Sequence, residues 1–85
     1  MKRDAAVERE ALERLKWRSR RGLLELDLVF ERFWRGEGAR LSQAEAAALE
    51  RLLAMPDNDL LDLVMGTVPS PAGDAGEVIK KLKAA

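Results

Sequence analysis

Apolar residues recur along most of this chain at the three- and four-residue spacing of an α-helix, and no stretch alternates with the period of two typical of a strand. The first such stretch, from Asp4 to about Trp17, carries a narrow apolar stripe and predicts a surface helix with one inward face. The next, from Leu23 to Trp34, is apolar at eight of its twelve positions and predicts the central helix. The run Gly36-Glu37-Gly38 is expected to end it in a turn.

A third helix is predicted from its start and stop signals. Ser42-Gln43-Ala44-Glu45 matches a capping box, in which the Ser42 hydroxyl accepts from the Glu45 amide and the Glu45 carboxylate accepts from the Ser42 amide. Apolar residues follow at helical spacing up to Pro56. Because proline pushes the residue before it out of the α region, the third helix is expected to end before Pro56.

Two short helices are predicted in the last third of the chain. Asp57 or Asp59 is expected to cap the fourth helix, and Gly66 is placed to close it. An exposed loop rich in Pro and Gly is expected over residues 67–73, followed by a final helix that Asp74 caps. We therefore predict an all-α protein, a small compact five-helix bundle. Its 85 residues, 47% of them hydrophobic, suffice for a single helical domain over 1–85.

Composition narrows the chemistry that this chain could perform. It has 15 Lys and Arg against 15 Asp and Glu, so no long-range positive field draws the whole molecule onto nucleic acid or an anionic membrane. It has neither cysteine nor histidine, which excludes disulfides, thiolate nucleophiles and Cys-based metal sites and removes the usual acid–base group of neutral pH. We therefore predict a protein that is not an enzyme, without catalytic residues and without a metal site.

The chain also lacks the signals of membrane insertion and export. No run approaches the roughly 20 apolar residues of a membrane span, and the N-terminal residues lack the apolar block of a signal peptide. We expect no membrane insertion and a location in the bacterial cytoplasm.

The segment from Trp17 to Asp27 stands out because it joins charges to a glycine and apolar residues. If one helix ran through it, Arg21 and Glu25 would lie nearly opposite the core face. Gly22, beside them, would cost roughly 1 kcal/mol relative to Ala inside a helix. Two explanations stay open: another surface approaches the Gly22 backbone closely, or Gly22 marks the junction between the first two helices.

Several functions compete for these residues. Alone, Arg21 and Glu25 make a surface ion pair of about 0.3–0.5 kcal/mol, but beside a glycine and apolar Trp17 they fit a protein–protein interface. The alternative is a small helical regulator that binds nucleic acid through a basic cluster with Trp17 interleaved, namely Lys16, Arg18, Arg20 and Arg21. An enzyme with Glu25 or Asp27 as general base would need a desolvated pocket, which so short a chain has little room to build.

At these residues the sequence resembles the SdhE family, small bacterial assembly factors for the flavoprotein subunit of succinate dehydrogenase. Arg21-Gly22-Leu23-Leu24-Glu25 fits the RGxxE motif of that family, and Trp17 stands upstream as in its W-x-x-R-R-G pattern. Glu25-Leu26-Asp27 repeats the family's ELD, and the run from Asp57-Asn58-Asp59-Leu60 to Val64-Met65 is similar to its later D-x-D-L…L-M segment. The resemblance covers about Leu15 to Gly66.

The resemblance implies a compact five-helix fold and a defined function. Such a protein binds the flavoprotein subunit of succinate dehydrogenase and promotes covalent attachment of FAD to a histidine of that partner. Fumarate reductase flavoproteins would be related clients, and we expect no nucleic acid partner. Arg21, Gly22 and Glu25 would form the contact surface, with Trp17 and Asp27 as supporting positions. We expect no tightly bound cofactor, because the chain shows no phosphate cradle and FAD is attached to the partner flavoprotein.

Overall fold

Each predicted helix has a counterpart in the computed structural model, which describes residues 9–36 and 40–85. The helices are α1 (Arg9–Arg18), α2 (Leu24–Arg35), α3 (Gln43–Leu53), α4 (Asp57–Met65) and α5 (Gly73–Ala84). No strand occurs in those two ranges, so the predicted all-α class and the five-helix architecture are confirmed. The expected start of the first helix at Asp4 lies outside the described residues, as does most of the expected turn at Glu37 and Gly38.

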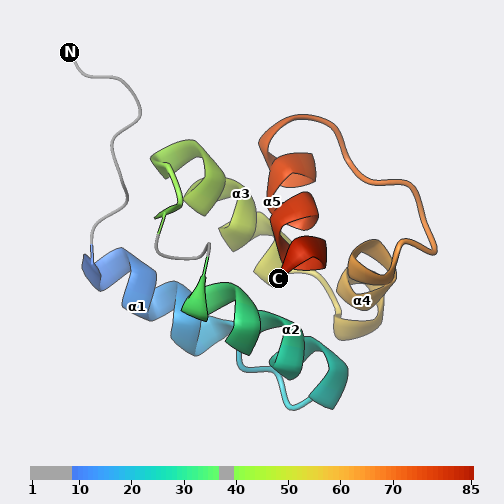
Figure 1. The fold of residues 1–85 in the computed structure, drawn as a ribbon, viewed down its shortest axis with the longest axis horizontal. Coiled ribbons are helices and arrows are strands. Elements are labelled where there is room, and N and C mark those ends of the chain that lie inside the picture. Colours follow the sequence, from blue (N-terminus) through green and yellow to red (C-terminus); the bar gives the residue numbers. More distant parts are fainter. Residues whose placement is uncertain (1–8, 37–39) are drawn as a thin grey trace.

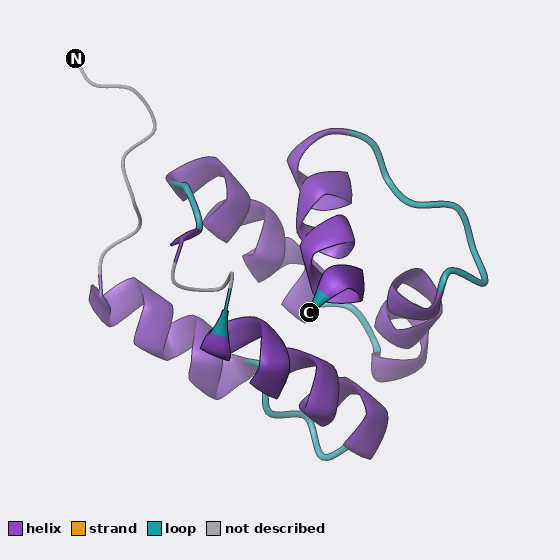
Figure 2. Ribbon diagram, in the orientation of Figure 1, coloured by secondary structure: helices purple, strands orange, loops and turns teal. Residues whose placement is uncertain are grey.

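The last helix occupies the middle of the molecule. α5 packs against α2, α3 and α4, and α1 packs against α3. Figure 1 shows this arrangement, with α5 between α3 and α4 and with α1 and α2 side by side below them. The exposed loop expected before α5 is present, and Figure 2 shows it bulging outward between α4 and α5. The apolar density of α2 predicted that it would be the central helix, but α5 is the helix that packs against three others, with Val78, Ile79 and Leu82 buried to 1% exposure or less.

One face of α2 is buried in the core. Leu26, Phe30 and Phe33 are among its core residues, and Leu23 and Trp34 pack partly against the same core. The Phe30 and Phe33 rings meet edge to face with centroids 6.3 Å apart, a favoured arrangement of aromatic rings. The apolar stretch predicted from Leu23 to Trp34 therefore contributes to the core of the molecule.

The start of α3 has the predicted capping box. The Glu45 amide donates to the Ser42 hydroxyl over 3.1 Å, and the Ser42 amide donates to the Glu45 carboxylate over 3.1 Å. Glu45 also holds the Lys81 ammonium of α5 at 3.0 Å. Burial raises the pKa of Glu45, but the Ser42 hydrogen bonds and the Lys81 charge outweigh burial and lower that pKa below its ordinary value. One carboxylate thus fixes the α3 start to α5.

Of the other predicted helix caps, the C-cap of α4 was correct and the N-caps of α4 and α5 were not. Gly66 ends α4 in the left-handed conformation at φ 82°, as predicted. The predicted N-caps of α4 and α5 were wrong: Pro56 and Ala72 occupy those positions without a side-chain cap, and Asp57 and Asp74 lie inside the first turns. Carboxylates in the first turn still interact favourably with the positive end of the helix dipole.

Among the residues described, none of the helices is both long and apolar enough to span a bilayer.

Candidate functional site

The connection between α1 and α2 begins at a buried polar side chain, Ser19, which is only 2% exposed. Its amide donates to the Leu15 carbonyl over 2.9 Å, and its hydroxyl donates to the Lys16 carbonyl over 2.7 Å. The same hydroxyl accepts from the Trp34 indole N–H of α2 over 3.0 Å. Ser19 therefore closes α1 and fixes α2 beside it.

Gly22 lies in this connection, outside both helices. Its φ is +82°, a left-handed conformation that residues with a Cβ rarely adopt, and no atom lies within 4 Å of the position that a Cβ would take. The structure thus identifies Gly22 as the junction between the first two helices, and it leaves open space on the side where a side chain would project. Glycine is needed there for backbone conformation, and the space beyond it is free for another surface.

Arg21 points into the molecule. Its guanidinium donates to three acceptors around the α3–α4 connection: Nη1 to the Leu53 carbonyl at 2.7 Å, Nη2 to the Met55 carbonyl at 2.5 Å and Nε to the Asp57 carboxylate at 2.5 Å. The Arg21 side chain is only 12% exposed. The surface ion pair considered for Arg21 and Glu25 is wrong, because α2 begins at Leu24 and Arg21 lies off the helical wheel on which that pair was drawn.

Asp27 holds the same connection from the other side. Its carboxylate accepts a hydrogen bond from the Arg21 backbone amide over 3.1 Å. The residue before Gly22 is thus fixed through its side chain by the α3–α4 connection and through its backbone by α2. Asp27 thus anchors the loop to α2, and the side chain of Arg21 anchors the loop to the α3–α4 connection.

Four exposed residues around the junction, Gly22, Leu24, Glu25 and Leu28, form a surface that we call the Gly22 face. All four are exposed, and Leu24 and Leu28, one helical turn apart, keep 69% and 44% exposure. Two exposed leucines beside a carboxylate and an open backbone have the mixed apolar and charged character of a protein interface. Trp17, in the last turn of α1, is 72% exposed, and exposed Trp is a common interface anchor.

Three of the four cations in the predicted basic cluster form ion pairs with carboxylates of the same chain. Lys16 pairs with Glu13 at 3.4 Å, Arg18 with Glu50 at 3.2 Å, and Arg21 with Asp57. Among the described residues, Arg20 alone of the four has no ion pair. The four cations therefore do not form one free basic surface.

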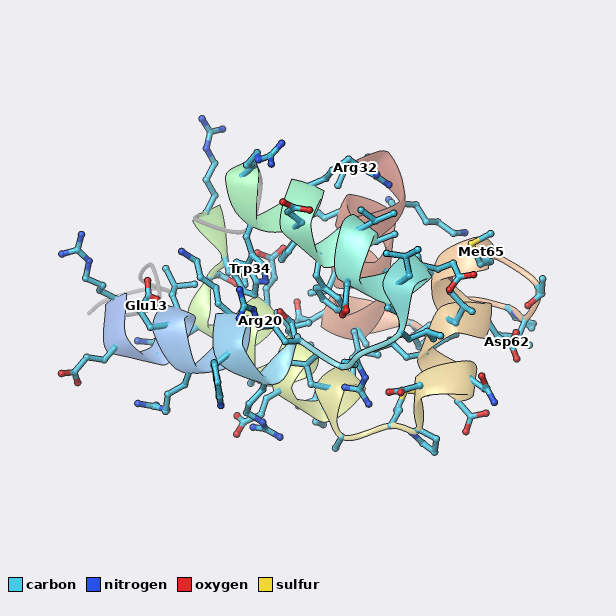
Figure 3. All side chains as sticks on the ribbon, turned by 90° about the horizontal axis from the view of Figure 1, so that it is seen from below. Glu13, Arg20, Arg32, Trp34, Asp62 and Met65 are labelled. Carbon is cyan, nitrogen blue, oxygen red and sulfur yellow. The ribbon has the colours of Figure 1, made fainter. Side chains whose placement is uncertain are left out.

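An open groove of about 710 Å³ separates the end of α1 from α2. Figure 3 shows Arg20 and Trp34 near each other between these two helices, and both line the groove. Three cations and two carboxylates share its walls: Lys16, Arg20, Arg35, Asp27 and Glu31. Its charge is therefore mixed.

Sequence reasoning missed Ser19 and the part that Asp57 plays in the site. Asp57 was expected as a helix cap, whereas it holds the motif arginine 36 residues before it in the chain. The signal was present, because both residues lie in segments on which the family resemblance rests. A resemblance to a family identifies the two segments, but it does not show that they are in contact.

The described residues form neither a cluster of metal ligands nor a glycine-rich dinucleotide loop. Within 9–36 and 40–85, no group of three or more acidic side chains is placed to hold a metal ion. The left-handed glycines of these ranges, Gly22, Gly66 and Gly73, lie at three separate places, between α1 and α2, at the end of α4 and at the start of α5, whereas a dinucleotide loop gathers its glycines in one turn.

Comparison with known proteins gives one family. Residues 13–85 match the family described as "Flavinator of succinate dehydrogenase". The protein named FAD assembly factor SdhE of Coxiella burnetii is 33% identical over 73 residues, which cover 86% of this chain and 89% of that protein. The protein of the same name from Idiomarina loihiensis is 37% identical over 67 residues, 79% of this chain and 74% of that protein.

A shorter match is more similar. The FAD assembly factor SdhE of Ralstonia nicotianae is 50% identical over 52 residues, 61% of this chain, and that match spans only 55% of the Ralstonia protein's length. No solved structure matches this chain.

Proposed function

Because the chain belongs to the SdhE family of succinate dehydrogenase flavinators, we propose that it binds the flavoprotein subunit of succinate dehydrogenase and promotes covalent attachment of FAD to that subunit. The single observation that carries this proposal is the construction of the junction at Gly22. The loop is held from two sides, by Arg21 and by Asp27, while the Gly22 face stays exposed. A rigid, open surface of this kind is suited to docking a protein.

The proposed contact surface is the Gly22 face, with Trp17 as a further anchor. Glu25 supplies an exposed carboxylate, Leu24 and Leu28 supply apolar area, and Gly22 lets the partner approach the backbone. Arg21 and Asp27 belong to the same site as the residues that shape it. This division of roles follows from their burial and hydrogen bonds.

The proposed action is positioning. The chain has no histidine or cysteine, so we place the reacting histidine on the partner and give this chain no catalytic residue. Docking at the Gly22 face would stabilise the conformation of the flavoprotein in which FAD and that histidine meet. Holding two reactants in a reactive geometry accelerates their reaction without proton transfer by the assembly factor.

FAD would be carried by the partner, since the described residues of this chain form no dinucleotide loop. Fumarate reductase flavoproteins are proposed as further clients. The lack of cysteine in the whole sequence suits a reducing compartment, and we place the encounter in the bacterial cytoplasm.

Nucleic acid binding is the other function considered, and two observations weigh against it. Three of the four cations that it requires are engaged in ion pairs within the molecule. The groove beside the fourth, Arg20, carries carboxylates as well as cations, and carboxylates repel phosphates. We therefore propose that nucleic acid is not a partner.

Covalent flavin measured by fluorescence on a denaturing gel tests the proposed function. Cells without their own assembly factor would express the succinate dehydrogenase flavoprotein subunit with this chain or with an empty vector. Flavin fluorescence restored on the subunit by this chain is the expected result. A subunit that is expressed at the same level and stays non-fluorescent beside folded chain would contradict the proposal.

A further inference from the structure

The side chain of Arg21 is the link between the docking loop and a segment far along the chain. The three acceptors of its guanidinium belong to residues 32 to 36 positions later. Two of them, the Leu53 and Met55 carbonyls, lie at and beyond the C-terminal end of α3, where helix carbonyls lack helical partners. A planar guanidinium with donors in a fixed fork is held in one orientation when three acceptors surround it.

Asp57 supplies the only full negative charge among those acceptors. Its carboxylate is 42% exposed, while the Arg21 side chain that it neutralises is 12% exposed. A little-exposed guanidinium needs a counter-ion, because a charge removed from water without one is unfavourable. Asp57 therefore supplies the counter-charge that favours the Arg21 guanidinium at the α3–α4 connection, beside the Leu53 and Met55 carbonyls.

Gly22 depends on its chain neighbours, because no contact restrains it on its open side. No atom lies within 4 Å of its would-be Cβ, and a glycine backbone accepts both positive and negative φ. The conformation of Gly22 is thus set by the residues next to it. Of these, Arg21 is fixed at its amide by Asp27 and at its guanidinium by Asp57.

We propose that Asp57 is a positioning residue for docking: it holds Arg21, and through Arg21 the backbone of Gly22, in the conformation that the flavoprotein recognises. The partner-binding role of this inference rests on the proposed function. Arg21 then contributes to docking through the loop rather than through contact with the partner. Asp57 itself does not touch the flavoprotein.

The first test uses the free protein and needs no partner. Asp57→Asn keeps the side-chain shape and one oxygen acceptor but removes the charge. Asp59→Asn is the matched control, because Asp59 is an exposed carboxylate of the same helical turn and the charge change is identical. Amide hydrogen exchange at Arg21 should accelerate roughly ten- to a hundredfold in Asp57→Asn, the loss expected for one charge-assisted hydrogen bond, and stay unchanged in Asp59→Asn. Unchanged exchange in both variants would overturn the proposal.

The second test measures affinity for the flavoprotein subunit by titration calorimetry, at a temperature where circular dichroism shows each variant folded. Asp57→Asn should weaken binding about tenfold, and Asp57→Glu, which keeps the charge, should recover part of that loss. Asp57→Asn combined with Arg21→Gln should bind no more weakly than Arg21→Gln alone, because both act through one link.

Additive losses would overturn the proposal, since they would mean that Arg21 contacts the partner independently of Asp57. Wild-type affinity in Asp57→Asn would overturn it as well. Failure of the unmodified chain to bind any flavoprotein subunit would contradict the proposed function instead, and the exchange measurement would still decide whether Asp57 shapes the loop.

Discussion

Replacement of Gly22 by arginine separates docking from folding, because the structure offers a matched control. Gly22 and Gly73 both have left-handed φ, +82° and +73°, and neither would-be Cβ has an atom within 4 Å. A Cβ at either position therefore meets no internal clash, and the substitution costs the backbone strain, about 1–2 kcal/mol. For a domain of this size, that strain lowers the melting temperature by roughly 4–16 °C. Gly22→Arg and Gly73→Arg should lose similar stability.

Binding should distinguish the two variants. The arginine side chain at position 22 would project into the space that the flavoprotein is proposed to occupy, whereas position 73 lies at the start of α5, outside the Gly22 face. We expect Gly22→Arg to weaken binding at least about a hundredfold, about 2.8 kcal/mol, and Gly73→Arg to bind like the unmodified chain. Gly22→Ala, with one added carbon, should fall between them.

Two measurements on each variant are sufficient: urea unfolding for stability, and titration calorimetry with the flavoprotein subunit for affinity. The affinity is taken where every variant is folded, so that strain alone does not lower the active fraction. Unchanged affinity in folded Gly22→Arg would refute the proposed docking at Gly22. Equal losses of affinity in Gly22→Arg and Gly73→Arg would refute the separation of docking from folding.

Three further predictions address the core, the α3–α5 link and the apolar part of the Gly22 face. Phe33→Ala should lower the free energy of unfolding by about 3–5 kcal/mol in urea titrations, because the Phe33 ring is fully buried; a loss below 1 kcal/mol would contradict the core described here. Folding lowers the pKa of Glu45, so its contribution to stability is present above its unfolded pKa of about 4.3 and is lost as pH falls through the lower folded pKa. Urea titrations from pH 7 to pH 3 should therefore show a shallower stability loss for Glu45→Gln than for the unmodified chain, and equal slopes would contradict that assignment. Leu24→Asp should leave the melting temperature nearly unchanged, since Leu24 is 69% exposed at the first turn of α2, and should weaken flavoprotein binding about tenfold; unchanged affinity would remove Leu24 from the interface.

The helices could be predicted from sequence because each has a local signal. The Ser42 capping box, Pro56 and Gly66 act over a few residues, and the apolar spacing of α2 marks its buried face without reference to its neighbours. The central place of α5 had no such signal. Its position depends on which faces of the other helices remain uncovered, and that is a property of the packed molecule.

The candidate site was predictable in its residues and unpredictable in their arrangement. The motif segment identified Arg21, Gly22 and Glu25, but a helical wheel assumes that the helix continues, and the chain leaves the helical conformation at residues 19–23. The Arg21 side chain points inward because its guanidinium donates hydrogen bonds to three acceptors of the α3–α4 connection. No pattern of local spacing reports a contact between residues 36 positions apart.

The most direct test of the central claim, that this chain promotes flavin attachment by docking through Gly22, is the rate of covalent flavin formation with purified components. The flavoprotein subunit without flavin would be mixed with FAD and with equal folded amounts of the unmodified chain, Gly22→Arg or Gly73→Arg, and covalent flavin would be followed on denaturing gels over time. We predict that the unmodified chain and Gly73→Arg accelerate attachment equally and that Gly22→Arg leaves the rate at its unassisted value. Full acceleration by Gly22→Arg, or no acceleration by the unmodified chain, would contradict the account.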